Sequence, residues 1–110
     1  MSTQYEGRRD TLDDAFVWKV DANLRVQLNP RLDLRNHSPD GFEWGYGGSG
    51  PAQLALALLC DATGDDELSL QLYQHYKDRV ISKIKRADKW VITRLEVLEW
   101  VARLGDRNVS

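Results

Sequence analysis

The chain has 110 residues, of which 42% are hydrophobic and 29% are charged, and its net charge at pH 7 is -2. This length is enough for one hydrophobic core and too short for two, so we expect a single domain over residues 1–110. The composition is that of an ordinary globular protein and excludes a mainly disordered chain. The nearly balanced charge also argues against a protein that binds nucleic acid through its overall charge.

The sequence shows no signal for a membrane or for secretion. Its longest apolar run, Leu54 to Cys60, has seven residues, whereas a helix that crosses a bilayer needs roughly 20. The first ten residues lack the apolar core of a secretory signal. The single cysteine, Cys60, lies in the apolar run, which is typical of a buried and inert thiol in a reducing compartment. We therefore expect a cytoplasmic protein.

In the first half of the chain, apolar residues alternate with polar ones. Every second residue is apolar from Phe16 to Val20 and again from Leu24 to Leu28, which predicts a β-hairpin whose alternate residues form a buried face. The alternation resumes at 32–35 and predicts a short third strand, and residues 42–44 are a weaker candidate for another. Residues 1–15 show no such pattern, so we expect this segment to be loosely ordered.

A central helix is expected after the glycine-rich stretch. Proline favours the first helical turn, so Pro51 marks the start, with Ser49 or Gly50 as the cap, and Gly64 ends the helix. Nearly every residue of the run is apolar, which predicts a helix buried on all sides.

Two more helices are expected in the second half of the chain. An amphipathic helix should run from about Asp66 to Lys85, followed by an extended segment at 90–92. Thr93 and Glu96 have the spacing of a capping box, which opens a last helix to about Leu104. The expected fold is therefore α+β, with a small antiparallel sheet from the N-terminal half packed on about three helices.

The glycine-rich loop contains the letters of a dinucleotide-binding motif. Gly45, Gly47 and Gly50 match G-x-G-x-x-G, but Pro51 places the helix start after the last glycine. Two helices then follow where the fold would require a second parallel strand, so a Rossmann site is excluded. No lysine follows the glycines, which excludes a P-loop.

A simpler anion site is compatible with this loop. Successive backbone amides next to a helix N-terminus suit a phosphate or a carboxylate, and exposed aromatic rings would stack on a base or a sugar. The residues expected to bind the ligand are His37, Glu43, Trp44, Tyr46, Gly47, Gly48, Ser49, Gly50 and Gln53. Alternatively, the glycines only allow a tight turn before a buried helix.

A catalytic role is another hypothesis for the loop. Glu43 or His37 near Ser49 would supply the acid–base and nucleophilic groups of a small hydrolase or transferase. Each of these residues also has a structural interpretation, because loop side chains often bond local backbone. The other histidine, His75, is far away in the sequence and matches no metal-ligand spacing, so we expect no metal and no cofactor.

A third hypothesis concerns a cluster of basic residues. The stretch from Lys77 to Lys89 contains six bases and two acids, and a basic helix face of this kind can meet nucleic acid or an acidic partner. A solvated surface explains the cluster equally well.

The segment LDLRNHSPDGFEWGYGGSGPAQLALALL, Leu32 to Leu59, resembles the signature block of an uncharacterised family of small bacterial and phage proteins. The similarity extends more loosely over YQHYKDRVISKI and KWVITRLEVLEWV. The resemblance implies one small domain of unknown function, often encoded near mobile elements, and it supplies no catalytic residue. We therefore expect a noncatalytic domain that binds an anionic small ligand, with a nucleotide as one candidate, or a protein partner through its loop. Interference with host defence, or its regulation, is the context that this resemblance suggests.

Overall fold

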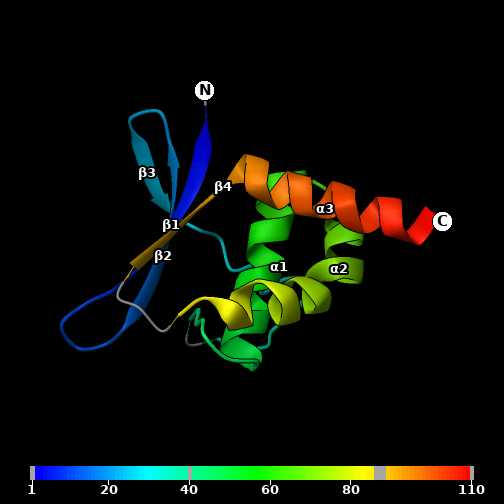
Figure 1. Cartoon of the computed structure of the whole chain (residues 1–110). Helices are drawn as coiled ribbons and strands as arrows, with labels where there is room; N and C mark the ends of the chain where they lie inside the picture. The colour runs from blue at the N-terminus through cyan, green and yellow to red at the C-terminus, as the bar shows by residue number, and fades with distance from the viewer. Residues whose placement is uncertain (1, 40, 86–88, 110) are drawn as a thin grey trace.

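The computed structural model describes residues 2–39, 41–85 and 89–109. Three helices pack against one side of a four-stranded antiparallel sheet with the order β3-β2-β1-β4 (Figure 1). The strands are β1 (Thr3–Arg9), β2 (Ala15–Asp21), β3 (Leu24–Gln27) and β4 (Lys89–Thr93). The helices are α1 (Ser49–Thr63), α2 (Asp66–Arg79) and α3 (Arg94–Val109), with a short 3-10 helix η1 (Ile81–Lys83) after α2. The expected α+β fold is confirmed.

The N-terminal segment forms β1, a central strand of the sheet between β2 and β4. The expectation of a loosely ordered segment is therefore wrong for residues 3–9. Four side-chain positions of β1 face the helices: Thr3, Tyr5, Gly7 and Arg9. Only Tyr5 among them is a large hydrophobic residue, so this strand shows no alternation of apolar and polar residues.

Packing explains the two unusual inward positions of β1. The indole of Trp90 on β4 occupies the place where a Cβ of residue 7 would lie, so Gly7 leaves room for it. The side chain of Arg9 is only 4% exposed and forms an ion pair with Glu43. A buried arginine is tolerated when a carboxylate compensates its charge.

The hairpin of β2 and β3 is confirmed, but the expected buried face is wrong for β2. The structure buries Val17, which is 3% exposed, and Leu28, which is 4% exposed. Phe16, Leu24 and Val26 are instead 37%, 65% and 43% exposed. A period of two separates the two faces of a strand without saying which of them meets the core. In β2 the helices cover the side of Val17, and Phe16 lies on the opposite face. The register pairs Val26 with Lys19 and Leu24 with Asp21, so the expected face of β3 lies on the same side as Val17, and Leu28 is buried there. Leu24 and Val26 lie on this side but stay exposed.

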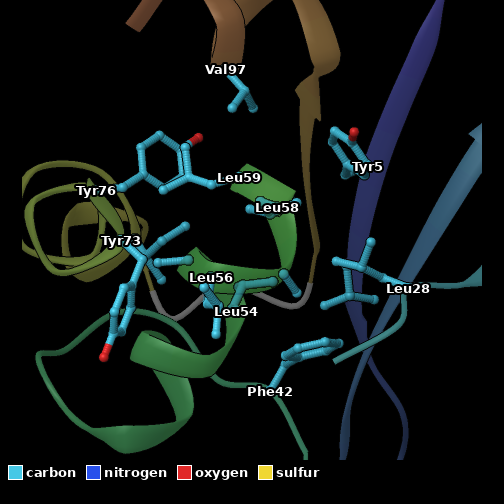
Figure 2. Close-up of a cluster of buried hydrophobic side chains, with 14 of the residues drawn as sticks. Tyr5, Leu28, Phe42, Leu54, Leu56, Leu58, Leu59, Tyr73, Tyr76 and Val97 are labelled. Carbon is cyan, nitrogen blue, oxygen red and sulfur yellow. The ribbon is translucent and has the colours of Figure 1, made fainter. Parts of the chain in front are cut away.

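Helix α1 is the central helix of the core, as expected. Every residue from Gly50 to Cys60 is buried, and the leucines of α1 contact side chains from the sheet, from α2 and from α3 (Figure 2). Burial raises the pKa of the Cys60 thiol, which agrees with an inert side chain.

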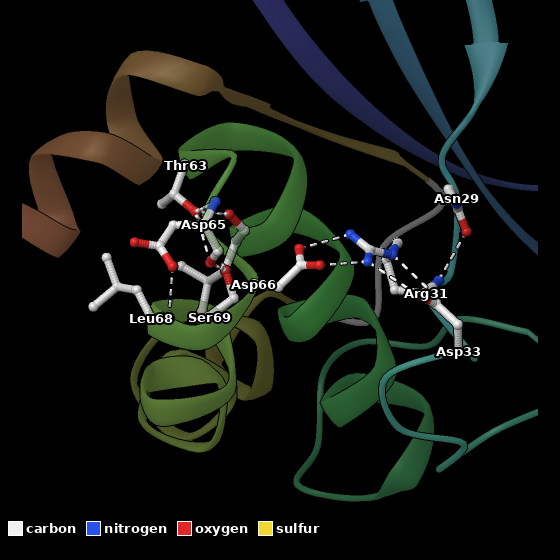
Figure 3. Close-up of polar contacts among 9 residues, drawn as sticks. Asn29, Arg31, Asp33, Thr63, Asp65, Asp66, Leu68 and Ser69 are labelled. Carbon is white, nitrogen blue, oxygen red and sulfur yellow. Dashed lines mark hydrogen bonds and ion pairs between the residues drawn. The ribbon is translucent and has the colours of Figure 1, made fainter.

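The segment after the hairpin is a turn held by Arg31, so the third strand expected at 32–35 is wrong. Arg31 adopts a positive φ of 57°, and its guanidinium donates two hydrogen bonds to Asp33 and two to Asp66 of α2 (Figure 3). Arg31 thereby lowers the pKa of both carboxyls. Residues 42–44 are not a strand either.

The predicted helix ends differ in accuracy. Gly64 ends α1 with a left-handed φ of 67°, and the capping box of Thr93 and Glu96 is present with both reciprocal bonds at 3.0 Å. Helix α2 ends at Arg79 rather than near Lys85, and α3 continues past Gly105. Among the described residues, no helix is long and apolar enough to span a membrane.

Candidate functional site

The segment that leads into the glycine-rich loop is held by Gln53, near the start of α1. The Gln53 side chain is fully buried. Its Oε1 accepts hydrogen bonds from the amides of His37 (2.8 Å) and Ser38 (3.1 Å). Its Nε2 donates to the carbonyls of Pro30 (2.6 Å) and Arg35 (3.0 Å). Since both lone pairs and both N–H groups are used, Gln53 positions the loop and has no hydrogen bond left for a ligand.

His37 is bonded to a side chain of α2. Its Nε2 lies 2.7 Å from the hydroxyl of Tyr73, and the two rings are 5.5 Å apart. Tyr73 is 6% exposed. The bond fixes the imidazole against the core, so His37 is part of the support of the loop.

Glu43 and Trp44 belong to one cluster with Arg9, in which Glu43 is partly exposed and Trp44 is buried. The two carboxylate oxygens of Glu43 accept hydrogen bonds from Arg9 at 2.6 and 3.1 Å. The same guanidinium lies 4.6 Å from the ring centre of Trp44, and Trp44 meets Trp90 edge-on at 5.5 Å. Trp44 has no exposed surface. Its expected role in stacking on a ligand is therefore not compatible with this position, and it packs in the core instead.

Two glycines give the loop its shape. Gly45 has a φ of 90°, which favours glycine, and its amide donates to the carbonyl of Ile81 at 3.1 Å. A Cβ added to Gly50 would lie 2.7 Å from the Cβ of Glu43. Gly50 therefore allows the start of α1 to pass close to the preceding segment, and its backbone is buried.

Between these two glycines the chain reaches the surface, and we call residues 46–49 the loop corner. Tyr46 is 43% exposed, and Gly47 and Ser49 are exposed as well. A Cβ added to Gly48 would lie 2.5 Å from the Tyr46 ring, so the ring rests against the Gly48 backbone. The amides of Gly47, Gly48 and Ser49 have no hydrogen-bond acceptor in the part of the chain that the structure describes.

The electrostatics of the loop corner favour a negative group. Gly48 is the N-cap of α1 and provides no side-chain bond, and the first turn of the helix contains no acidic residue. The first amides of a helix lack partners within the helix, and they carry the positive end of its dipole. The loop corner therefore presents backbone donors in a positive field.

Glu43 also lines a hollow of about 440 Å³ between the β1–β2 loop and residues 38–43. Asp13 and Asp14 contribute the other acidic side chains. Neither His37 nor Ser49 is among the described residues that line it. The acid, the base and the nucleophile of the expected catalytic alternative do not converge there, and Asp40 of this segment lies outside the described residues. Among the described residues no three potential metal ligands gather.

The partners of the loop side chains were not predictable from the sequence. Arg9 binds Glu43, and Tyr73 binds His37, yet neither was expected near the glycines. Arg9 lies 34 positions from Glu43 and Tyr73 lies 36 from His37. No local pattern marks such pairs.

The basic cluster is not one helix face. Helix α2 ends at Arg79, η1 follows, and β4 begins at Lys89, whereas residues 86–88 lie outside the described residues. Lys77 is only 18% exposed in its side chain and lies 3.4 Å from the Asp78 carboxylate. The described bases are distributed over several elements, so the expectation of a continuous basic helix face is wrong.

Comparisons with known proteins give one match. A family model described as a family of unknown function, DUF6166, matches residues 5–103. Searches of curated proteins and of solved structures gave no significant match. The matched range includes most of β1, the glycine-rich loop and the first ten residues of α3, so it covers most of the fold and the candidate site. The chain therefore belongs to the family of unknown function DUF6166.

Proposed function

We propose that this protein is a noncatalytic binding module whose loop corner receives an anionic group, a phosphate or a carboxylate. One observation carries the proposal: the amides of Gly47, Gly48 and Ser49 lack acceptors within the described structure at an uncapped helix end. Backbone donors at a helix N-terminus recur as binding sites for such groups. Tyr46 lies beside these amides with much of its ring exposed, where it can contact the molecule that bears the anion.

The bonding of the surrounding polar side chains favours binding over catalysis. Gln53 is saturated by four backbone bonds, His37 is bonded to Tyr73, and Glu43 is paired with Arg9. A general base or nucleophile needs a reacting group within hydrogen-bond distance. These side chains instead make the bonds that hold the loop in place.

A titration followed by ¹H–¹⁵N NMR tests the proposal. Inorganic phosphate and sodium acetate are added in parallel at constant ionic strength, as probes of the two anion classes. We expect the amide signals of residues 47–49 to shift and to saturate. A stronger response to phosphate points to a phosphorylated small molecule, and a stronger response to acetate points to a carboxylate of a protein partner. Unchanged signals with both probes overturn the proposal.

A matched pair of variants sharpens this test. Ser49→Asp places a carboxylate in the first turn of α1, where it competes for the free amides, whereas Ser49→Asn has a similar shape without the charge. We expect Ser49→Asp to weaken phosphate binding by about tenfold or more, and Ser49→Asn to change it by less than about threefold. Equal affinities of the two variants contradict an anion site at this position.

The biological setting stays a prediction. The resemblance noted in the sequence suggests a bacterial or phage protein encoded near mobile elements, with a role connected to host defence. The genes that surround family members test this expectation, because a defence or mobile-element context would recur among them.

A further inference from the structure

A second hollow, of about 250 Å³, lies between the end of α2, β4 and α3. None of the loop-corner residues lines it. Its walls are formed by Tyr76, Val80, Ile92, Glu96, Glu99, Trp100 and Arg103. The apolar members come from all three elements, whereas the charged members all come from α3. The hollow is smaller than the pockets that bind drug-sized ligands, so it suits a small group.

The most informative wall residue is Tyr76. It is only 2% exposed, and its ring extends from α2 toward Val97 of α3 (Figure 2). The ring contacts Trp100 edge-on, with 4.9 Å between centres. No hydrogen-bond partner of the Tyr76 hydroxyl is present among the described residues. Burial, and then the negative charge of Glu96, raise the pKa of Tyr76, so the hydroxyl stays protonated and neutral.

The Tyr76 hydroxyl is the polar tip of an otherwise buried ring, and it opens into the hollow. It is not sealed inside the core, because the buried side-chain atom that lacks a hydrogen-bond partner among the described residues is Trp90 Nε1. The hydroxyl oxygen can therefore accept a hydrogen bond from a molecule that occupies the hollow.

The charged wall is asymmetric along α3. Glu96 uses Oε1 in the capping box, where it accepts bonds from the amide and hydroxyl of Thr93. Glu99 lies about one turn further along and has no ion pair among the described residues. Arg103 follows after another turn, and the side chains of Glu99 and Arg103 are both exposed. The two carboxylates therefore stand at the end near Tyr76, and the single guanidinium stands at the other end.

We propose that this hollow binds a primary ammonium group on a short aliphatic stem. The ammonium donates to the Glu99 carboxylate and to the Tyr76 hydroxyl oxygen, and it lies near the Trp100 ring, where a cation is favoured. The stem packs against Val80 and Ile92. This site uses other residues than the loop corner and prefers the opposite charge, so the two proposals stand or fall separately.

The probe is n-butylammonium, with butyrate as an anion of the same chain length. Binding is followed through the indole N–H signal of Trp100, which a Trp100→Phe variant assigns. We expect a saturable shift with butylammonium and a much weaker one with butyrate. An equal or larger response to butyrate overturns the proposal, as does the absence of a saturable shift with butylammonium.

Variants identify the contacts. Glu99→Gln keeps the shape and removes the charge, and we expect it to weaken butylammonium binding by about tenfold. Arg103→Gln removes the competing cation and should tighten binding, an effect of opposite sign. Tyr76→Phe removes only the hydroxyl and should weaken binding several-fold. Glu67→Gln, an exposed position of α2 outside the hollow, is the control for net charge.

If Glu99→Gln binds butylammonium as tightly as Glu67→Gln does, the proposed site is overturned. Free amines and lysine side chains both carry a primary ammonium group. Nα-acetyl-lysine methylamide, whose side-chain ammonium is free, is therefore compared with butylammonium. Tighter binding of the lysine compound assigns the hollow to a lysine of a partner protein. Tighter binding of butylammonium assigns it to a small free amine.

Discussion

The first backbone amides of a helix have no partner within the helix, and the N-terminal ends of α1 and α2 differ in what they offer these amides. At α2, the side chain of Asp65 accepts a hydrogen bond from the amide of Leu68, and Asp66 and Glu67 place acids in the first turn (Figure 3). At α1, the cap is Gly48, with no side-chain bond and no acid in the first turn. One end is closed by its own side chains, and the other leaves its donors open.

The difference shows what stabilises each helix. Helix α2 is half exposed, so its end depends on local caps. Helix α1 is buried almost along its whole length, and Gln53 ties its start to the preceding segment. Most of the stability of a helix in a protein comes from packing rather than from propensity. The packing of α1 therefore leaves its first amides available for a bound group.

The largest expected effect is at Gln53, because its side chain bonds four backbone groups of the segment that precedes α1. Gln53→Leu leaves two amides and two carbonyls without their partner, and it places an apolar side chain against them. We expect the free energy of unfolding to fall by about 3–5 kcal/mol. Urea denaturation measures the change, with the exposed position Gln74→Leu as control. A loss below about 1 kcal/mol contradicts the assignment of Gln53 as the main support of this end.

The next largest effect distinguishes a glycine that is needed for close packing, Gly50, from one whose Cα faces open space, Gly47. Gly50→Ala brings a Cβ to 2.7 Å from the Cβ of Glu43, and we expect a loss of about 1–3 kcal/mol. Gly47→Ala points into open space and should change stability by less than about 0.5 kcal/mol. Thermal unfolding of the pair tests this order. The reverse order contradicts a close approach at Gly50.

A smaller effect on stability is expected when the cap of α2 is removed and an acidic residue is added to the start of α1. Asp65→Ala removes the cap of α2 and should destabilise the protein by about 1 kcal/mol. Ser49→Asp adds an acid to α1 and should stabilise it by about 0.3–1 kcal/mol. The gain should shrink in 1 M salt, since salt screens exposed charges. A loss of stability in Ser49→Asp at low salt argues against a positive field at the loop corner.

The smallest expected effect is a pH dependence at the α2 end. Arg31 lowers the folded-state pKa of Asp33 and Asp66. The contribution of these two carboxyls to the free energy of unfolding is therefore fully present above the unfolded pKa of about 4. It is lost as the pH falls through the lower folded pKa values. Denaturation between pH 7 and pH 2 measures it. Arg31→Gln should make the free energy of unfolding fall less steeply as the pH drops below about 4. An unchanged pH dependence means that this ion-pair cluster does not contribute to it.

Features with a local cause were predictable. The end of α1 at Gly64, the start of α2 at Asp66 and the capping box of Thr93 and Glu96 are present as expected, because each depends on residues within a few positions. The buried character of α1 was also predictable, since its apolar residues surround the helix.

Features that depend on residues far apart in the sequence were not predictable. Strand β1 was missed because its inward positions include Gly7, which makes room for Trp90, and Arg9, which pairs with Glu43. The candidate site was only partly located. Its exposed corner lies within the expected residues, but Trp44 and His37 are bonded or buried by segments that lie far away in the sequence.

The sequence by itself determined where α1 ends, where α2 and α3 begin and which helix is central, because caps, glycines and apolar periodicity act over a few residues. Only the tertiary structure decided which face of the hairpin is buried, that residues 3–9 join the sheet, and which loop side chains are used as supports. These outcomes depend on contacts between segments that are distant along the chain, such as Arg9 with Glu43 and Gln53 with Pro30. Only after these contacts form does the loop corner stand out as the open part of the loop.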